Sequence, residues 1–129
     1  MTYAPVPEDV ERIGTVAVDV GLAVHRLLGP GFKERIYQTA YRLELERRGV
    51  PFECEKSVEV RFREWLIPGQ RIDLIVAKAI VVEVKAVSTL KPIHRRQVVS
   101  YLKTTGLRLG YVFNFHTVLF KDGVRRIVL

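Results

Sequence analysis

Apolar residues near the start of the chain recur at the spacing of an α-helix. Between residues 8 and 28 they occupy one face, and polar residues occupy the other. The apolar positions are Ile13, Val16, Val20, Ala23, Val24 and Leu27. This period predicts an amphipathic helix that ends at "GPG" (29–31). A second helix is expected from about Phe32 to Arg48, closed by Gly49. Its apolar residues include Ile36, Ala40, Leu43 and Leu45.

Beyond residue 50 the apolar period shortens to the alternation that is typical of β-strands. Residues 57–62 ("SVEVRF") alternate between apolar and polar side chains. "RIDLIV" (71–76) and "AIVVEVKA" (79–86) are two further strands with a very short connection. "LIPGQ" (66–70) predicts a turn before them. We expect Trp65 beside that turn to be an anchor of the core, with an exposed stacking residue as the alternative.

The C-terminal part of the chain adds a helix and more strands. Pro92 and Gly106 bound the helix, since proline favours the first turn and glycine the end. "LRLGYVFNF" (107–115) follows as a buried strand, and residues 117–129 predict a hairpin around Asp122-Gly123. The order ααβββαβββ describes a single α/β domain over residues 1–129, with a mixed central sheet.

Composition agrees with a globular domain. The 129 residues are 48% hydrophobic and 27% charged, which is typical of a folded core and not of disorder. No apolar run approaches the roughly 20 residues of a membrane span, and residues 1–12 lack the basic-then-apolar order of a secretory signal. We therefore expect a cytoplasmic protein with no membrane partner. Cys54 is the sole cysteine, which excludes a disulfide framework and a cysteine zinc site.

Basic residues outnumber acidic ones. The sequence has 21 Lys and Arg against 14 Asp and Glu, a formal net charge of +7. Such a surface attracts polyanions, of which nucleic acid is the commonest in a cell. A domain that is basic without binding nucleic acid is the alternative, and charge alone does not separate the two.

The strand "AIVVEVKAV" (79–87) contains an acid and a base in its most apolar part. Burying a charged side chain costs several kcal/mol unless it is paired or bound to an ion. Glu83 and Lys85 point to the same face because alternate strand residues do. Asp73 on the preceding strand lies opposite Glu83, leaving a three-residue turn at 77–79, or opposite Lys85. Either register brings two carboxylates and one ammonium together.

Two neighbouring carboxylates repel each other, and a divalent cation removes that conflict. Mg²⁺ prefers oxygen ligands and uses one or two carboxylates. Lys85 could then orient or deprotonate the attacking water, or stabilise charge developing on a phosphate. The alternative is a structural ion pair of Lys85 with Asp73 or Glu83. The pattern D-x9-E-x-K by itself leaves both interpretations open.

The setting of these residues resembles a known nuclease family. Asp73-x9-Glu83-Val-Lys85, on a β-hairpin followed by a helix, is similar to the PD-(D/E)XK nuclease superfamily. "AVHRLLGPGFKERIY" (23–37) resembles the GxxExxY family within it, with Gly31, Glu34 and Tyr37 at the motif positions. The resemblance runs from about Val16 to the C-terminus. Ile72 stands where the superfamily's eponymous proline would be, a position that varies across the superfamily.

The resemblance implies a fold and an activity. The fold would be restriction-endonuclease-like, with an αβββαβ core and a mixed central sheet flanked by helices. The activity would be metal-dependent hydrolysis of the phosphodiester bonds of nucleic acid, with DNA the expected substrate. By this resemblance the ligands of Mg²⁺ or Mn²⁺ are Asp73, Glu83 and Glu34. The catalytic set adds Lys85 and Gln97, the latter on the helix after the hairpin.

The same helix carries the expected contacts to nucleic acid. Gln97 and Tyr101 lie one turn apart on one face, a spacing similar to that of RecB-type nucleases. The run His94-Arg95-Arg96 precedes them, and we expect these side chains to contact phosphate. A homodimer with two sites would suit so small a domain. A nucleic-acid-binding module without turnover, and a scaffold for a protein partner, are the alternatives.

Overall fold

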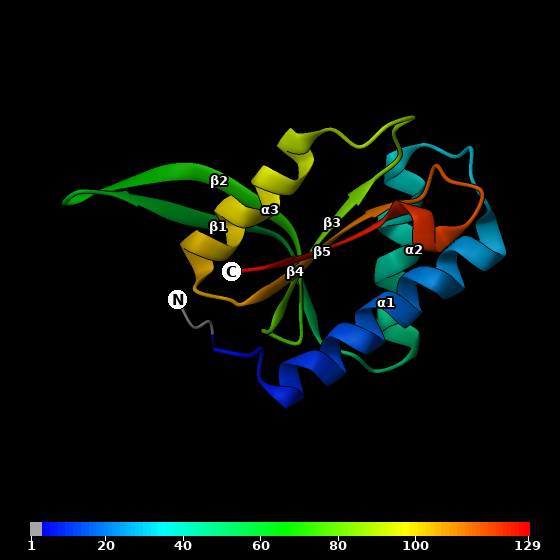
Figure 1. Cartoon of the computed structure of the whole chain (residues 1–129), viewed down its shortest axis with the longest axis horizontal. Coiled ribbons are helices and arrows are strands. Elements are labelled where there is room, and N and C mark those ends of the chain that lie inside the picture. The colour runs from blue at the N-terminus through cyan, green and yellow to red at the C-terminus, as the bar shows by residue number, and fades with distance from the viewer. Residues whose placement is uncertain (1–3) are drawn as a thin grey trace.

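A five-stranded sheet with helices on both faces forms the structure, a computed structural model that describes residues 4–129 (Figure 1). The strands lie in the order β1-β2-β3-β4-β5. Only β3 and β4 pair in parallel. The elements are α1 (Glu8–Leu28), α2 (Glu34–Arg47), β1 (Phe52–Phe62), β2 (Trp65–Val76), β3 (Ile80–Lys85), α3 (Pro92–Thr105), β4 (Leu109–Asn114), a short 3₁₀ helix (Phe120–Gly123) and β5 (Val124–Val128). The predicted αβββαβ core is confirmed by the run from α2 to β4.

Each face of the sheet has its own core. Val82 and Val84 of β3 pack with residues of α1 and α2. Val81 belongs to the opposite face, where it packs with residues of α3. Because side chains alternate along a strand, Glu83 and Lys85 lie on the α3 face with Val81.

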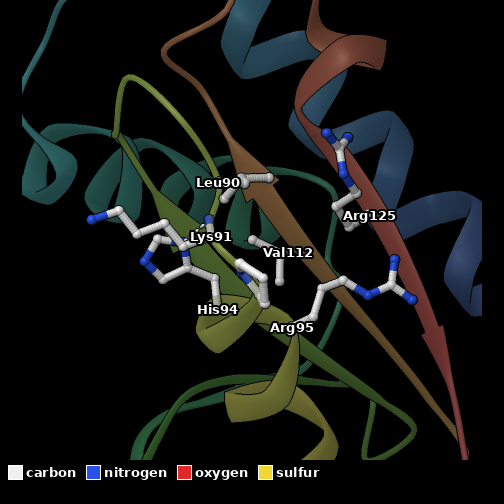
Figure 2. A pocket seen from close by; sticks show the side chains of 7 residues that line it. Leu90, Lys91, His94, Arg95, Val112 and Arg125 are labelled. Atoms are coloured by element: carbon white, nitrogen blue, oxygen red, sulfur yellow. Dashed lines mark hydrogen bonds between the residues drawn. The ribbon is translucent and has the colours of Figure 1, made fainter.

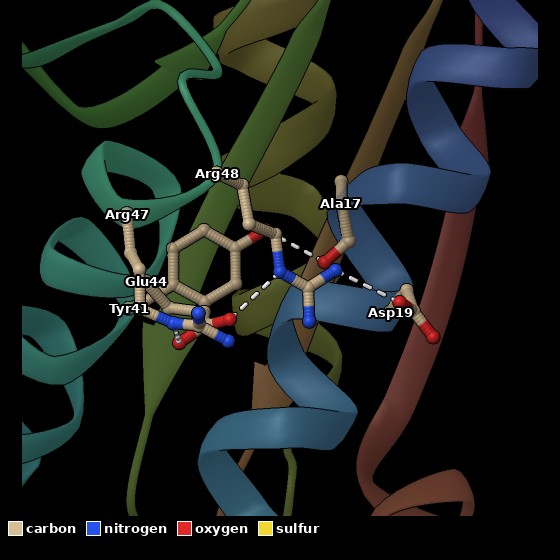
Figure 3. Close-up of polar contacts among 6 residues, drawn as sticks. All are labelled: Ala17, Asp19, Tyr41, Glu44, Arg47 and Arg48. Carbon is tan, nitrogen blue, oxygen red and sulfur yellow. Dashed lines mark hydrogen bonds and ion pairs between the residues drawn. The ribbon is translucent and has the colours of Figure 1, made fainter.

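Tyrosines supply the buried side of α2. The buried residues of this helix are Tyr37, Tyr41 and Leu45, spaced four apart. The Tyr41 hydroxyl donates to the Ala17 carbonyl of α1 at 2.7 Å (Figure 3). Ile36 and Leu43, expected on the apolar side, are instead 46% and 59% exposed.

Ion pairs at the surface add to the contact between α1 and α2. The Arg48 guanidinium, just after α2, donates to Glu44 at 2.7 Å and to Asp19 of α1 at 2.8 Å (Figure 3). These pairs are exposed and contribute little stability individually. No helix within residues 4–129 has the length and apolar character to cross a membrane.

Strands β1 and β2 form a long arm that extends beyond the rest of the sheet (Figure 1). The prediction of a turn at 66–70 is wrong, because these residues lie inside β2 and the chain turns at 63–64. Pro68 and Gly69 are accommodated by a bulge, since the register shifts between Val58 and Val60. The core-anchor prediction for Trp65 is also wrong. Its side chain is 55% exposed at the arm tip and stacks on Phe62.

The predicted hairpin around Asp122-Gly123 is wrong as well. These residues belong to the 3₁₀ helix, and β5 pairs with β4 instead of with a strand at 117–119. Phe120 is buried against Gly21 of α1, where a Cβ atom would clash with its ring. Gly123 sits against the Asn114 carbonyl in the same way. The glycine therefore serves close packing, which a local turn motif does not reveal.

Candidate active site

The candidate site lies at the point where β2 and β3 separate, beyond Leu74 and Val82, which we call the fork. Their pairing runs from Val76 opposite Ile80 to Leu74 opposite Val82, and stops there. Continuing the register by one step places Asp73 opposite Glu83, with the predicted three-residue turn at 77–79. The turn contains no glycine, yet Ala77 and Lys78 have φ values of 50° and 56°. Both residues thus adopt the left-handed conformation that the connection needs.

Asp73 lies at a local irregularity in the pairing of β1 with β2 and contacts α2. The regular pairing of β1 with β2 skips Glu55 and Asp73, and Glu55 has a φ of 51°. The Asp73 Oδ2 atom accepts a hydrogen bond from Gln38 Nε2 of α2 at 3.5 Å. The Asp73 carboxylate also lies close enough to Glu83 to raise the pKa of that carboxyl. Asp73 therefore joins α2 to the two strands at the fork.

Glu83 is a buried carboxylate whose charge is only partly compensated. Its exposed fraction is 2%. Its Oε2 atom lies 3.6 Å from Lys85 Nζ, while Oε1 is buried with no hydrogen-bond partner among the described residues. The pKa of the Glu83 carboxyl is raised to about 8, first by burial and then by the nearby charges of Asp73 and Glu34, with Lys85 opposing the rise. Without a further cation, Glu83 thus holds a proton at neutral pH.

The first turns of α2 provide polar side chains that face Asp73. Glu34, Gln38 and Arg42 are spaced four apart and so lie on one side of the helix. Gln38 Nε2 donates to Glu34 Oε2 at 3.4 Å as well as to Asp73. A small cavity of about 100 Å³ beside Asp73 is also lined by Arg42 and Arg71.

Gln38 was missed by the sequence prediction, although its four-residue spacing from Glu34 is a usable signal. It links the carboxylates of Glu34 and Asp73, which lie on different elements. Within residues 4–129, no group of three or more Asp, Glu, His or Cys side chains is arranged closely enough to hold a metal ion. Direct ligation by Glu34 therefore stays a prediction.

Tyr37 fixes the loop from which α2 starts. Its buried hydroxyl donates to the Gly29 carbonyl at 2.5 Å and accepts from the Phe32 amide at 3.1 Å. Its ring stacks on Phe115 at 4.8 Å. Tyr37 thus holds the GPG loop against the core, and this loop sets where Glu34 begins the helix. That is a physical reason for glycine, glutamate and tyrosine to occur at this spacing.

We predict that Tyr37→Phe lowers the free energy of unfolding by about 1–3 kcal/mol, since two partly buried backbone hydrogen bonds are lost. Tyr41→Phe is the matched control. Its acceptor, the Ala17 carbonyl, also has a helical backbone partner, so the expected loss is about 1 kcal/mol. Urea unfolding measures both. Equal losses in the two variants would contradict a special role of Tyr37 in the loop.

Helix α3 brings Tyr101 close to the carboxylates. Tyr101 is buried. The pKa of its hydroxyl is raised to about 12, first by burial and then by the charges of Glu83 and Asp73, while Gln97 lowers it. The hydroxyl therefore lies within electrostatic reach of both acids. The predicted one-turn spacing places Gln97 next to Tyr101 at this edge of the site.

The basic run at the start of α3 is divided between a structural contact and free surface. His94 Nδ1 accepts a hydrogen bond from the Lys91 amide at 3.0 Å, which caps the helix. Arg95 and Arg96 are exposed. Contact of these three side chains with nucleic acid stays a prediction.

Asn114 of β4 is a second residue that the sequence prediction missed. It is 3% exposed, and its side chain bonds both the amide and the carbonyl of Val87, at 3.0 and 2.9 Å. The Phe115 amide donates to the Lys85 carbonyl at 2.9 Å. Together these bonds fix the backbone on which Lys85 stands. The signal was a polar residue inside an apolar strand, as for Glu83.

The donors at the fork fit a small divalent cation. Asp73 and Glu83 offer carboxylate oxygens from adjacent strands, the ligand type that Mg²⁺ and Mn²⁺ prefer. The partnerless Glu83 Oε1 supplies a free oxygen in a buried position. A cation would remove the repulsion between the carboxylates, which Lys85 alone relieves in part.

Comparisons with known proteins agree with this architecture. The sequence model of the PD-(D/E)XK nuclease superfamily matches residues 11–127. Among solved structures, the crystal structure of SSO0001 is similar, with a TM-score of 0.50 at 22% sequence identity. The match covers 72% of this chain and 47% of SSO0001, so this chain corresponds to about half of that protein. No curated protein matches the chain. At this level of identity, the structural likeness supports the fold alone.

Proposed function

The chain belongs to the PD-(D/E)XK nuclease superfamily, and from this premise we propose that it hydrolyses phosphodiester bonds of nucleic acid with Mg²⁺ or Mn²⁺. The observation that carries the proposal is the buried Glu83 carboxylate. Its Oε1 atom has no hydrogen-bond partner among residues 4–129, it lies beside Asp73, and Lys85 Nζ is 3.6 Å away. A buried carboxylate oxygen without a partner costs free energy, and a bound cation would offset that cost.

The residues of the fork have distinct roles in this proposal. A divalent cation, when bound by Asp73 and Glu83, supplies Lewis-acid activation of water and neutralises charge at the phosphate. Lys85 lies between that pair and solvent, with an 18% exposed side chain. Its ammonium can therefore reach a phosphate oxygen and stabilise the charge that develops there. Gln38 holds Asp73 in place, and Gln97 and Tyr101 border the site from α3.

Finer features belong to the same proposal. The positions of Gly31, Glu34 and Tyr37 support a GxxExxY type of nuclease, in which Glu34 assists the metal site. The net charge of +7 and the exposed Arg95 and Arg96 support a nucleic-acid substrate, DNA in the first instance. The cytoplasmic location and the homodimer stay predictions of the sequence.

The test is a cleavage panel. Single- and double-stranded DNA and RNA are incubated with the wild-type protein in Mg²⁺, Mn²⁺ or EDTA. We expect cleavage of at least one substrate that depends on the divalent cation. Binding without cleavage of any substrate would favour the non-catalytic nucleic-acid-binding module. Neither binding nor cleavage would favour a scaffold for a protein partner.

A further inference from the structure

A basic cavity lies on the α3 face of the sheet, between the start of α3 and strands β4 and β5 (Figure 2). Its volume is about 230 Å³, which exceeds the roughly 30 Å³ of a water molecule several-fold. Its lining residues are Leu90, Lys91, Pro92, His94, Arg95, Val112 and Arg125. None of these described lining residues is acidic. The cavity therefore combines an apolar floor with positive charge.

The charged side chains come from distant parts of the sequence. In Figure 2, Lys91 and His94 stand on one side of Val112, and Arg95 and Arg125 stand on the other. Three cations around one cavity repel one another unless an anion compensates them. Such an arrangement is typical of a site that is completed by an anionic ligand.

Several donors are available for that anion. His94 Nδ1 accepts a hydrogen bond from the Lys91 amide, so the neutral ring carries its proton on Nε2 and can donate there. Arg125 Nη1 donates to the carbonyls of Asp122 and Val124 at 2.9 and 3.0 Å. These bonds hold the guanidinium in place and leave its other N–H groups available.

The sheet register connects this cavity to the candidate active site. Glu83 lies opposite Val112 in the pairing of β3 with β4, and Val112 lies opposite Arg125 in the pairing of β4 with β5. These residues form one row across the α3 face. Since neighbouring strands are about 4.8 Å apart, the Arg125 position lies about 10 Å from that of Glu83.

We propose that the cavity of Lys91, His94, Arg95 and Arg125 binds a second phosphate of the nucleic-acid strand that is cut at the fork. This inference rests on the proposed nuclease function and adds where the substrate strand runs. At 3.4 Å of helix rise per nucleotide, a separation of about 10 Å places that phosphate within about three nucleotides of the cut bond. The ligand is a phosphate group, either an internal diester or a terminal monoester.

The test measures binding without catalysis. Fluorescent hexanucleotides of DNA and RNA, with a 5′-phosphate or a 5′-hydroxyl, are titrated in EDTA at about 0.1 M salt, where distant charges are screened. The double variant Lys91→Gln/Arg125→Gln should bind about tenfold more weakly, since charged hydrogen bonds to phosphate are lost. It should also show a shallower salt dependence. Arg12→Gln/Arg26→Gln, on exposed positions of α1, removes the same charge from the other face and should bind as wild type.

The outcomes separate the sources of the phosphate and the two proposals. Loss on every hexanucleotide assigns an internal diester, whereas loss only with the 5′-phosphate assigns a terminal one. No wild-type binding, or a double variant no weaker than the control, overturns the second phosphate site even if the protein cleaves in Mg²⁺. Binding at the cavity in EDTA, without cleavage of any substrate in Mg²⁺, would contradict the proposed hydrolysis and leave the second phosphate site standing. The exposed single variant Lys91→Gln, with about half of the effect, keeps the test valid if the double variant unfolds.

Discussion

Lys85→Ala is expected to slow divalent-dependent cleavage by on the order of a hundredfold or more while the protein still binds nucleic acid and metal. Lys85 Nζ lies 3.6 Å from Glu83 and its side chain is partly exposed, so it can act on charge that develops at the phosphate. A group that interacts more strongly with the transition state than with the bound substrate changes the rate and not the binding. Loss of one such preorganised electrostatic group typically has an effect of this size.

Lys78→Ala is the matched control for this experiment. Lys78 is exposed in the turn at the other end of the same hairpin, so its loss removes an equal charge away from the site. Single-turnover cleavage and equilibrium binding are measured for both variants. If Lys85→Ala only lowers stability and cuts as fast as Lys78→Ala, the lysine merely completes an ion pair.

Glu83→Gln is expected to abolish divalent-cation binding and to stabilise the metal-free protein at alkaline pH. The pKa of the Glu83 carboxyl is raised from an ordinary 4.5 to about 8 in the folded protein, mainly by burial, then by Asp73 and Glu34, with Lys85 opposing. A raised folded-state pKa contributes stability that is fully present below pH 4.5 and is lost as the pH rises through 8. Wild type in EDTA should therefore lose on the order of a few kcal/mol across this window.

The variant should show a flatter profile, because a glutamine amide does not ionise there. Urea unfolding in EDTA between pH 5 and 9 measures the difference. Adding Mn²⁺ at pH 8.5 should restore the stability of wild type and leave Glu83→Gln unchanged, because a ligand that binds only the native state stabilises it. Glu64→Gln, exposed in the turn of the arm, should follow wild type. Parallel profiles for wild type and Glu83→Gln would mean that ionisation of Glu83 does not lower the stability of the folded protein at alkaline pH.

Local patterns in the sequence were sufficient to predict that Asp73, Glu83 and Lys85 lie together at the fork. The charges in an apolar strand and the short 77–79 connection reduced the hairpin to two registers, and both of them bring Asp73, Glu83 and Lys85 together. The two N-terminal helices and α3 followed from periodicity and from Pro92 and Gly106. The αβββαβ core and the approach of α3 to the site came from the family resemblance and not from these patterns.

The errors arose where distant residues decide the structure. Pro68-Gly69 looks like a turn in isolation, but a bulge in the long β1–β2 pairing accommodates it. Asp122-Gly123 looks like a hairpin turn, but the packing of Phe120 on α1 and of Gly123 on β4 decides its conformation.

Site residues that depend on tertiary contacts were likewise beyond local patterns. Gln38 meets Asp73 only because the fold places α2 beside β2. Arg125 joins the basic cavity only through the pairing of β5 with β4. A sequence alone does not encode such contacts in any short motif, since they depend on which elements become neighbours.

The most direct measurement is a Mn²⁺ titration at pH 8, followed by calorimetry and by paramagnetic broadening of backbone amide signals. The account predicts saturable heat and broadening that is centred on Asp73 and on Glu83 to Lys85, both absent in Glu83→Gln. No heat and no broadening, or broadening centred on another part of the chain, would contradict a divalent-cation site at the fork.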